Sequence, residues 1–149
     1  MDKRKWVKDA FCRYWRYVAT VAKCKEELQD VELPAPGGTN YSAAGGRVGG
    51  NGQERKVLSY LEKKEEIQAR MNVALAKIDT VRKTIKHFAV EETAKGKLHR
   101  KYIECRFVKG MGYQRAAIEC GIAESTGAFW LTEILEVAVA IAEMEGNFH

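Results

Sequence analysis

Apolar residues recur along most of this chain at steps of three, four and seven, the spacing that gathers them on one face of a helix. In residues 3–31 this spacing predicts a single amphipathic helix about eight turns long. The stripe consists of Val7, Phe11, Tyr14, Val18, Val21 and Leu28. Trp6, Trp15 and Tyr17 lie partly off it, so we expect additional aromatic surface, either in the core or at a protein interface.

The next segment, residues 33–53, interrupts the pattern. It contains both prolines and seven of the thirteen glycines, with almost no charge, which is typical of a linker or long loop. Its paired glycines lack the Gly-Lys-Ser/Thr sequence that grips a nucleotide phosphate. We therefore expect a connection that lets the first helix fold back on the next one or exchange onto another subunit.

Helical spacing returns in residues 54–93 and predicts the longest helix of the chain. Its apolar members are Val57, Leu61, Met71, Leu75, Ile78, Val81, Ile85 and Phe88, with Leu58 and Ile67 to the side. The later members step by four and three, close to the repeat of a coiled-coil seam. So long a helix needs a partner, either the first helix or a second chain. Val90 to Gly96 then reads as a short connection, with Gly96 as a stop.

Residues 98–135 carry helix, stop and restart signals at short intervals. An apolar face predicts a helix that ends near Lys109, and a second, two-turn helix follows from Tyr113 to Cys120. Ala116, Ala117 and Cys120 form its inner side, small enough for another helix to cross closely. Gly121 can take the positive φ of a tight turn, and Ile122 after it is expected to be buried.

A last helix is expected from Glu124 to Glu145, with Glu124 or Ser125 capping or charging its start. A helix, a three-residue glycine turn and a second helix is the order that lays the second helix into a DNA major groove. We therefore predict an all-α fold with four segments. These are an N-terminal helix in 1–32, a Gly/Pro-rich linker in 33–53, a long helix in 54–94 and a helix-turn-helix domain in 95–149.

Three short runs in this region resemble region 4 of bacterial sigma factors: Gly112-Tyr113, Ala116-Ala117-Ile118, and Gly121-Ile122 with Glu124-Ser125-Thr126. The whole layout is similar to the ArpU and RinA group of phage-encoded transcriptional regulators. That resemblance covers most of the chain, and Gly121, Thr126 and the Ala-rich last helix match best. It implies a DNA-binding activator of late phage genes that acts with host RNA polymerase in the bacterial cytoplasm.

The candidate DNA contacts fall into two groups. Base edges would be met near the start of the last helix, by Ser125, Thr126, Ala128, Phe129 and Thr132. Phosphates would be held from the preceding helices, by Lys101, Arg106, Lys109, Gln114 and Arg115. The last helix has no Lys or Arg, so bidentate readout of guanine from it is excluded. We expect hydroxyl, apolar or shape-based contacts instead.

The charge distribution reverses inside this motif. Lys95 to Arg115 contains seven basic residues against Glu104 alone, which gives +6, whereas Ala116 to His149 contains six acids and no Lys or Arg, which gives −6. Basic charge on the supporting helices would neutralise phosphates and steer the chain to DNA. A solvated helix face is the alternative explanation.

Composition excludes several other classes. The four cysteines form no CxxC pair and share no ligand spacing with His87, His99 or His149, so we expect reduced core cysteines, no metal and no cofactor. No Ser, His or acid arrangement indicates an enzyme. No apolar segment with the pattern of a signal peptide or membrane span is evident, so we expect a cytoplasmic protein without membrane contact.

Two alternative functions remain open. Residues 127–144 are apolar on more than one face, which is typical of a helix buried on more than one side. This helix would then provide core plus a dimer or docking surface, and the chain would be an interaction module without a DNA role. A small terminase-like DNA packaging subunit is the other alternative. For the regulator we expect a homodimer bound to double-stranded DNA.

Overall fold

A computed structural model of the chain describes residues 2–31, 46–90 and 93–148, and its described residues are helical with short turns between them. The helices are α1 (Lys3–Cys12), α2 (Tyr14–Asp30), α3 (Gly46–Val90), α4 (Ala94–Ile103), the π-helix η1 (Glu104–Val108), α5 (Tyr113–Cys120) and α6 (Glu124–Met144). The predicted all-α class is thereby confirmed. The chain divides into two compact units, one of Met1–Ala19 with Ala74–His149 and one of Thr20–Val73.

The predicted single N-terminal helix is wrong, because the chain breaks at Arg13. Arg13 has φ −112° and ψ 23°, outside the helical region, and α2 restarts at Tyr14. The break separates two side chains that contact the same part of the fold. Phe11 packs on Phe107 with ring centroids 5.0 Å apart, and the indole N–H of Trp15 donates to the carbonyl of Val108. Since no Gly or Pro marks the break, tertiary contacts decide it.

The long helix begins earlier than its apolar pattern predicts. α3 starts at Gly46, so residues 46–53 of the predicted linker are helical, and residues 32–45 lie outside the described part of the chain. At its other end, Thr93 caps α4 by accepting a hydrogen bond from the backbone N–H of Gly96 at 3.1 Å. Gly96 is therefore a buried residue inside α4 and not the predicted stop.

In the unit of Thr20–Val73, parts of α2 and α3 lie side by side. Val21 and Cys24 of α2 are buried, as is Ile67 of α3. An ion pair of 2.6 Å between Glu27 and Arg70 adds to this contact. The predicted α3 stripe is wrong here, because Ile67 occupies the core whereas Leu58 and Leu61 are exposed.

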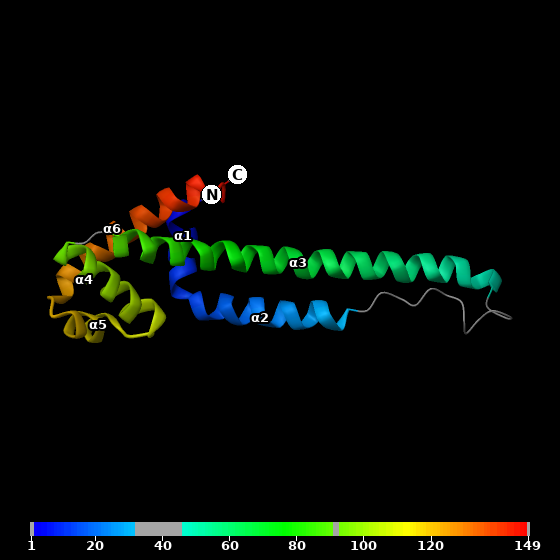
Figure 1. Cartoon of the computed structure of the whole chain (residues 1–149), viewed down its shortest axis with the longest axis horizontal. Coiled ribbons are helices and arrows are strands. Elements are labelled where there is room, and N and C mark those ends of the chain that lie inside the picture. The colour runs from blue at the N-terminus through cyan, green and yellow to red at the C-terminus, as the bar shows by residue number, and fades with distance from the viewer. Residues whose placement is uncertain (1, 32–45, 91–92, 149) are drawn as a thin grey trace. The chain divides into compact units, whose positions relative to one another are not determined.

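The larger unit has its core between α1, the Ala74–Val90 part of α3, α4, α5 and α6. Figure 1 shows α4 and α5 at one end of the unit, with α6 running from them to α1. Its fully buried residues come from every one of these helices. They include Val7, Ala10, Val81, Ile103, Ala116, Ile134, Ala138 and Ala142. Alanines on α1, α5 and α6 leave the helix backbones close together, as the small residues of α5 predict.

Gly127 of α6 marks the closest approach of two helices in this core. A Cβ at this position would lie 2.9 Å from the ring and the hydroxyl oxygen of Tyr102, a side chain of α4 that is 1% exposed. Real Cβ atoms do not come that close to a buried ring. The glycine weakens α6 by about 1 kcal/mol relative to alanine, and in exchange the Tyr102 ring packs directly on the α6 backbone.

Among the described helices, α6 alone is long and apolar enough to cross a membrane, judged by length and composition only. The same helix supplies core residues of the larger unit and packs on α1, α4 and α5. Core helices of folded domains meet the same criterion. The expected absence of membrane contact remains a prediction.

Candidate nucleic-acid interface

The turn between α5 and α6 is closed by backbone hydrogen bonds around Gly121. Gly121 adopts φ +66° and ψ 34°, the left-handed conformation that glycine takes without strain. Its N–H donates to the carbonyl of Ile118 at 3.1 Å, and the next N–H, of Ile122, donates to Ala117 at 3.0 Å. This pair of bonds is the Schellman arrangement, which satisfies the last carbonyls of a helix. The predicted helix Tyr113–Cys120 and its glycine turn are confirmed.

The start of α6 differs from the prediction in one respect. Ala123 precedes the helix and no side chain caps it, so Ser125 lies in the first turn instead of capping it. Glu124 does occupy the first turn, where a negative charge favours the helix dipole. Ile122 is only half-buried, less than predicted. Because no cap uses its hydroxyl, Ser125 keeps it available to solvent.

The residues predicted to read bases line an open face of α6. Ser125, Ala128 and Phe129 are exposed, Phe129 by 62%, while Thr126 and Thr132 are half-buried. The hydroxyl of Thr132 donates to the carbonyl of Ala128 at 3.4 Å, which occupies its proton within the helix. The face therefore presents one free hydroxyl at Ser125, a small methyl at Ala128 and a large apolar ring.

The predicted phosphate contacts divide into four exposed residues and one half-buried arginine. Lys101, Lys109, Gln114 and Arg115 are exposed on α4, the η1–α5 turn and α5. Arg106 instead belongs to the turn itself. Its guanidinium lies 3.8 Å from the centre of the Tyr113 ring and donates to the carbonyl of Met111 at 3.2 Å. Its role toward phosphate remains a prediction.

Sequence reasoning missed a polar cluster that joins α4 to α6. The ring of His99, 3% exposed, is stacked between Phe88 and Trp130, with centroids 5.1 Å and 4.4 Å away. Its Nδ1 lies 2.7 Å from the carbonyl of Lys95 and its Nε2 lies 2.9 Å from a carboxylate oxygen of Glu133. The carboxylate of Glu133 is thus engaged inside the protein. The sequence contained two signals for this cluster. Lys95 stands four residues before His99, and His99 lies on an apolar helix face.

A second missed cluster joins α1, α2 and α3 within the larger unit. The ammonium of Lys77, 7% exposed, donates to Asp9 at 3.0 Å and to the carbonyl of Trp6 at 3.2 Å, and lies 4.3 Å from the centre of the Trp6 ring. The hydroxyl of Tyr17 also donates to Asp9. Burial and then this hydrogen bond raise the pKa of Tyr17 to about 12.

Burial opposes the ionised form of Asp9, but the hydrogen bonds from Tyr17 and Lys77 outweigh it, so the pKa of Asp9 is lowered from 3.8. Asp9 therefore carries its charge at neutral pH and holds Tyr17 and Lys77 together. This cluster lies beneath α1 and stabilises the fold. It has no open site for a ligand among its described contacts.

All four cysteines are free thiols, as predicted, but only three are in the core. Cys24, Cys105 and Cys120 are buried, whereas Cys12 is exposed. Burial and the neighbouring Cys105 raise the pKa of the Cys120 thiol, which favours the unreactive protonated form. Among the described residues no group of three or more His, Cys, Asp or Glu side chains could hold a metal ion. The three buried thiols are packing groups.

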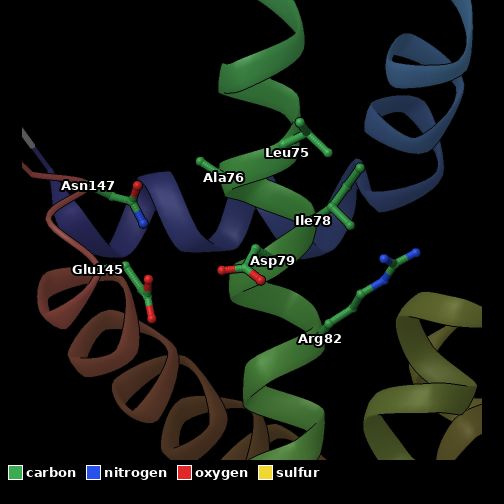
Figure 2. A pocket seen from close by; sticks show the side chains of 7 residues that line it. All are labelled: Leu75, Ala76, Ile78, Asp79, Arg82, Glu145 and Asn147. Atoms are coloured by element: carbon green, nitrogen blue, oxygen red, sulfur yellow. The ribbon is translucent and has the colours of Figure 1, made fainter. Parts of the chain in front are cut away.

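An open pocket of about 390 Å³ lies in the larger unit, between α3 and the segment that follows α6. Figure 2 shows Glu145 and Asn147 approaching Asp79 from that segment, with Ile78 and Arg82 on the far side of α3. Lys83 spans the two acids, with nitrogen–oxygen distances of 3.0 Å to Asp79 and 2.5 Å to Glu145. The Lys83–Glu145 pair fastens the end of α6 to α3, whereas Lys83–Asp79 lies within α3, and the pocket is lined by side chains of both charges.

Comparisons of the chain with protein-family models, with curated proteins and with solved structures find no match.

Proposed function

We propose that this chain is a DNA-binding transcriptional regulator of a phage or prophage, with α5 and α6 as a helix-turn-helix. The observation that carries the proposal is the glycine turn at Gly121, which joins two helices through three residues and leaves the start of α6 open. This is the geometry that presents a second helix to a major groove. The resemblance to ArpU and RinA regulators adds activation of late genes with host RNA polymerase.

Affinity in this proposal comes from the supporting helices and specificity from α6. Lys101, Lys109 and Arg115 are exposed cations that neutralise phosphates and set the register of the protein on the duplex. Ser125 meets a donor or acceptor on a base edge, and Phe129 with Ala128 meets a thymine methyl. The protein works as a homodimer on double-stranded DNA in the bacterial cytoplasm, without a cofactor and without enzymatic activity.

The acidic residues of α6 would repel DNA phosphates. The His99 cluster reduces this repulsion, because it engages one of them. Glu133 accepts from the buried ring of His99, and its other oxygen lies 4.0 Å from the ammonium of Lys95. Its charge is therefore partly compensated before DNA approaches. Glu124 remains exposed at the start of the helix. We expect it to disfavour a phosphate there and to accept a hydrogen bond from a cytosine amino group.

The salt dependence of binding tests the proposal. Replacing Lys109→Gln and Arg115→Gln together removes two phosphate contacts and should lower the slope of log affinity against log salt by roughly 1.8, since each contact contributes about 0.9. The matched control is Lys5→Gln with Lys8→Gln, two exposed lysines of α1. Fluorescence anisotropy on a mixed-sequence duplex gives both slopes. Equal slopes in the two double variants would reject the proposed contacts.

A protein-interaction module is the second candidate, favoured by exposed apolar side chains on both helices of the motif. Ile118 of α5 is 76% exposed and Phe129 of α6 is 62% exposed. If the wild type fails to bind any duplex, this second function replaces the first. The mass of the assembly in solution discriminates the third alternative, because a ring of many subunits favours a packaging subunit and a dimer favours the regulator.

A further inference from the structure

Two large aromatic side chains beside the turn between η1 and α5 are left open by the fold. Trp15, at the start of α2, is 55% exposed and Tyr113, at the start of α5, is 43% exposed. Both belong to the larger unit and both are tied to the same turn of chain. Together with Arg106 and Lys109 they form what we call the aromatic turn. Exposed aromatic rings that gather around one segment are a common feature of binding surfaces.

Each ring of the aromatic turn is held in place by a polar contact. The indole N–H of Trp15 donates to the carbonyl of Val108, the last residue of η1. The guanidinium of Arg106 lies 3.8 Å from the centre of the Tyr113 ring and is itself bonded to Met111. The rings therefore lose little conformational freedom when a flat ligand stacks on them, which lowers the entropy cost of binding.

The backbone beside these rings is bare. Gly110 has φ +72°, and at both Gly110 and Gly112 an added Cβ would meet no atom within 4 Å. A ligand can thus approach the main chain between η1 and α5 without displacing a side chain. The Nε of Arg106 is buried and lacks a hydrogen-bond partner within the described structure.

The charge around the aromatic turn is positive. Lys109 and Arg115 are exposed at its edge, and Lys101 is exposed on the preceding helix. The acid within η1, Glu104, accepts a hydrogen bond from Arg100 at 3.1 Å and is compensated by it. Exposed aromatic rings beside cations are the combination that binds single-stranded nucleic acid, because bases stack on the rings and phosphates meet the cations.

We propose that the aromatic turn binds an unstacked nucleobase of single-stranded nucleic acid, with Trp15 and Tyr113 as stacking surfaces and Lys109 and Arg115 as phosphate contacts. The guanidinium of Arg106 covers one face of the Tyr113 ring, so the base stacks on the other face. This activity goes beyond the proposed duplex binding, because bases inside a duplex are already stacked and cannot reach the rings. DNA and RNA strands share the required chemistry.

Binding of labelled oligodeoxyuridylate, oligouridylate and a mixed-sequence duplex tests the proposal by fluorescence anisotropy. Tyr113→Leu and Trp15→Leu should each weaken single-strand binding roughly tenfold, the effect of losing one base–aromatic stack. Tyr113→Phe keeps the ring and should bind as the wild type does. Tyr60→Leu, at a half-buried tyrosine of α3 whose ring centre lies 5.9 Å from the Lys64 ammonium, should also leave single-strand affinity unchanged. The ratio of the two oligonucleotide affinities assigns the preferred sugar.

The outcomes separate this proposal from the duplex proposal. If the wild type binds duplex but neither single strand, the aromatic turn is a duplex or protein contact and the present proposal is overturned. Equal losses in Tyr113→Leu and Tyr60→Leu would overturn it as well. Because Trp15→Leu also removes a hydrogen bond, thermal unfolding of each variant is measured. Lys109→Gln, an exposed substitution that leaves the packing intact, should weaken both single strands in low salt, and unchanged affinity would count against the site.

Discussion

The first half of α6, from Glu124 to Thr132, leaves the Phe129 ring 62% exposed, whereas the second half, from Glu133 to Met144, buries Ile134, Ala138 and Ala142 completely. Both halves carry large apolar side chains, so the presence of such residues alone does not distinguish them. What differs is the neighbour. The second half lies under α1, and the first half has its outer face uncovered. An apolar helix can therefore serve as core and as an open surface along its own length.

The largest expected effect comes from replacing two adjacent aromatic residues in the first half of α6, one at a time. Trp130 is 8% exposed and stacks on His99, whereas Phe129 points outward. Trp130→Ala should lower the free energy of unfolding by about 3–5 kcal/mol. Phe129→Ala should change it by no more than about 0.5 kcal/mol. Urea unfolding followed by circular dichroism measures both. A large loss in Phe129→Ala would mean that the first half is not an open surface.

A smaller effect is expected at the crossing of α6 with Tyr102. Gly127→Ala places a methyl 2.9 Å from the Tyr102 ring. The clash should cost about 1–3 kcal/mol, more than the roughly 1 kcal/mol of helix propensity that alanine adds. At the exposed position 128 we expect the opposite preference. Ala128→Gly should lower the free energy of unfolding by about 1 kcal/mol, because alanine has the higher helix propensity. Alanine favoured at both positions would show that the crossing can relax.

The smallest expected effect is on the pH dependence of stability. It acts through the hydrogen bond from Tyr17 of α2 to Asp9 of α1, the helix that packs on the second half of α6. The folded pKa of Tyr17, about 12, exceeds its ordinary value of 10.0. Its contribution to stability is therefore fully present below pH 10.0 and is lost as pH rises toward about 12. Tyr17→Phe should flatten stability over this range and cost about 1 kcal/mol at neutral pH. Urea midpoints across this range check the slope, and an identical slope in Tyr17→Phe would remove the tyrosine from the explanation.

Local signals in the sequence predict α5 and its glycine turn well, because these features depend on neighbours along the chain. Gly121 is predicted from the backbone conformation that it takes, and Ala116 and Ala117 from their size and spacing. For these residues, the neighbouring positions in the sequence are enough to explain the local structure. The exposure of Phe129 does not follow from periodicity, because the apolar residues of α6 cover more than one face.

Features that depend on distant residues could not be predicted in the same way. Nothing near Arg13 marks a helix break, because the contacts of Phe11 and Trp15 with η1 decide it. Ile67 rather than Leu61 faces α2, and the pattern of α3 alone offers both. The buried charge of Lys77 and the partnership of His99 with Glu133 join residues 34 or more positions apart. From the sequence alone, charged side chains of this kind are interpreted as solvent-exposed, because their partners lie far along the chain.

The π-helix η1 places one extra residue between α4 and the turn. The N–H of Lys109 donates to the carbonyl of Glu104 at 2.8 Å, five residues back instead of four. In an ordinary helix each residue advances the direction of its side chain by about 100°. Shortening the bulge by one position would restore regular winding and turn all that follows by that angle. The π-helix therefore sets the direction in which α5 and α6 leave α4. One additional residue in the chain determines that direction.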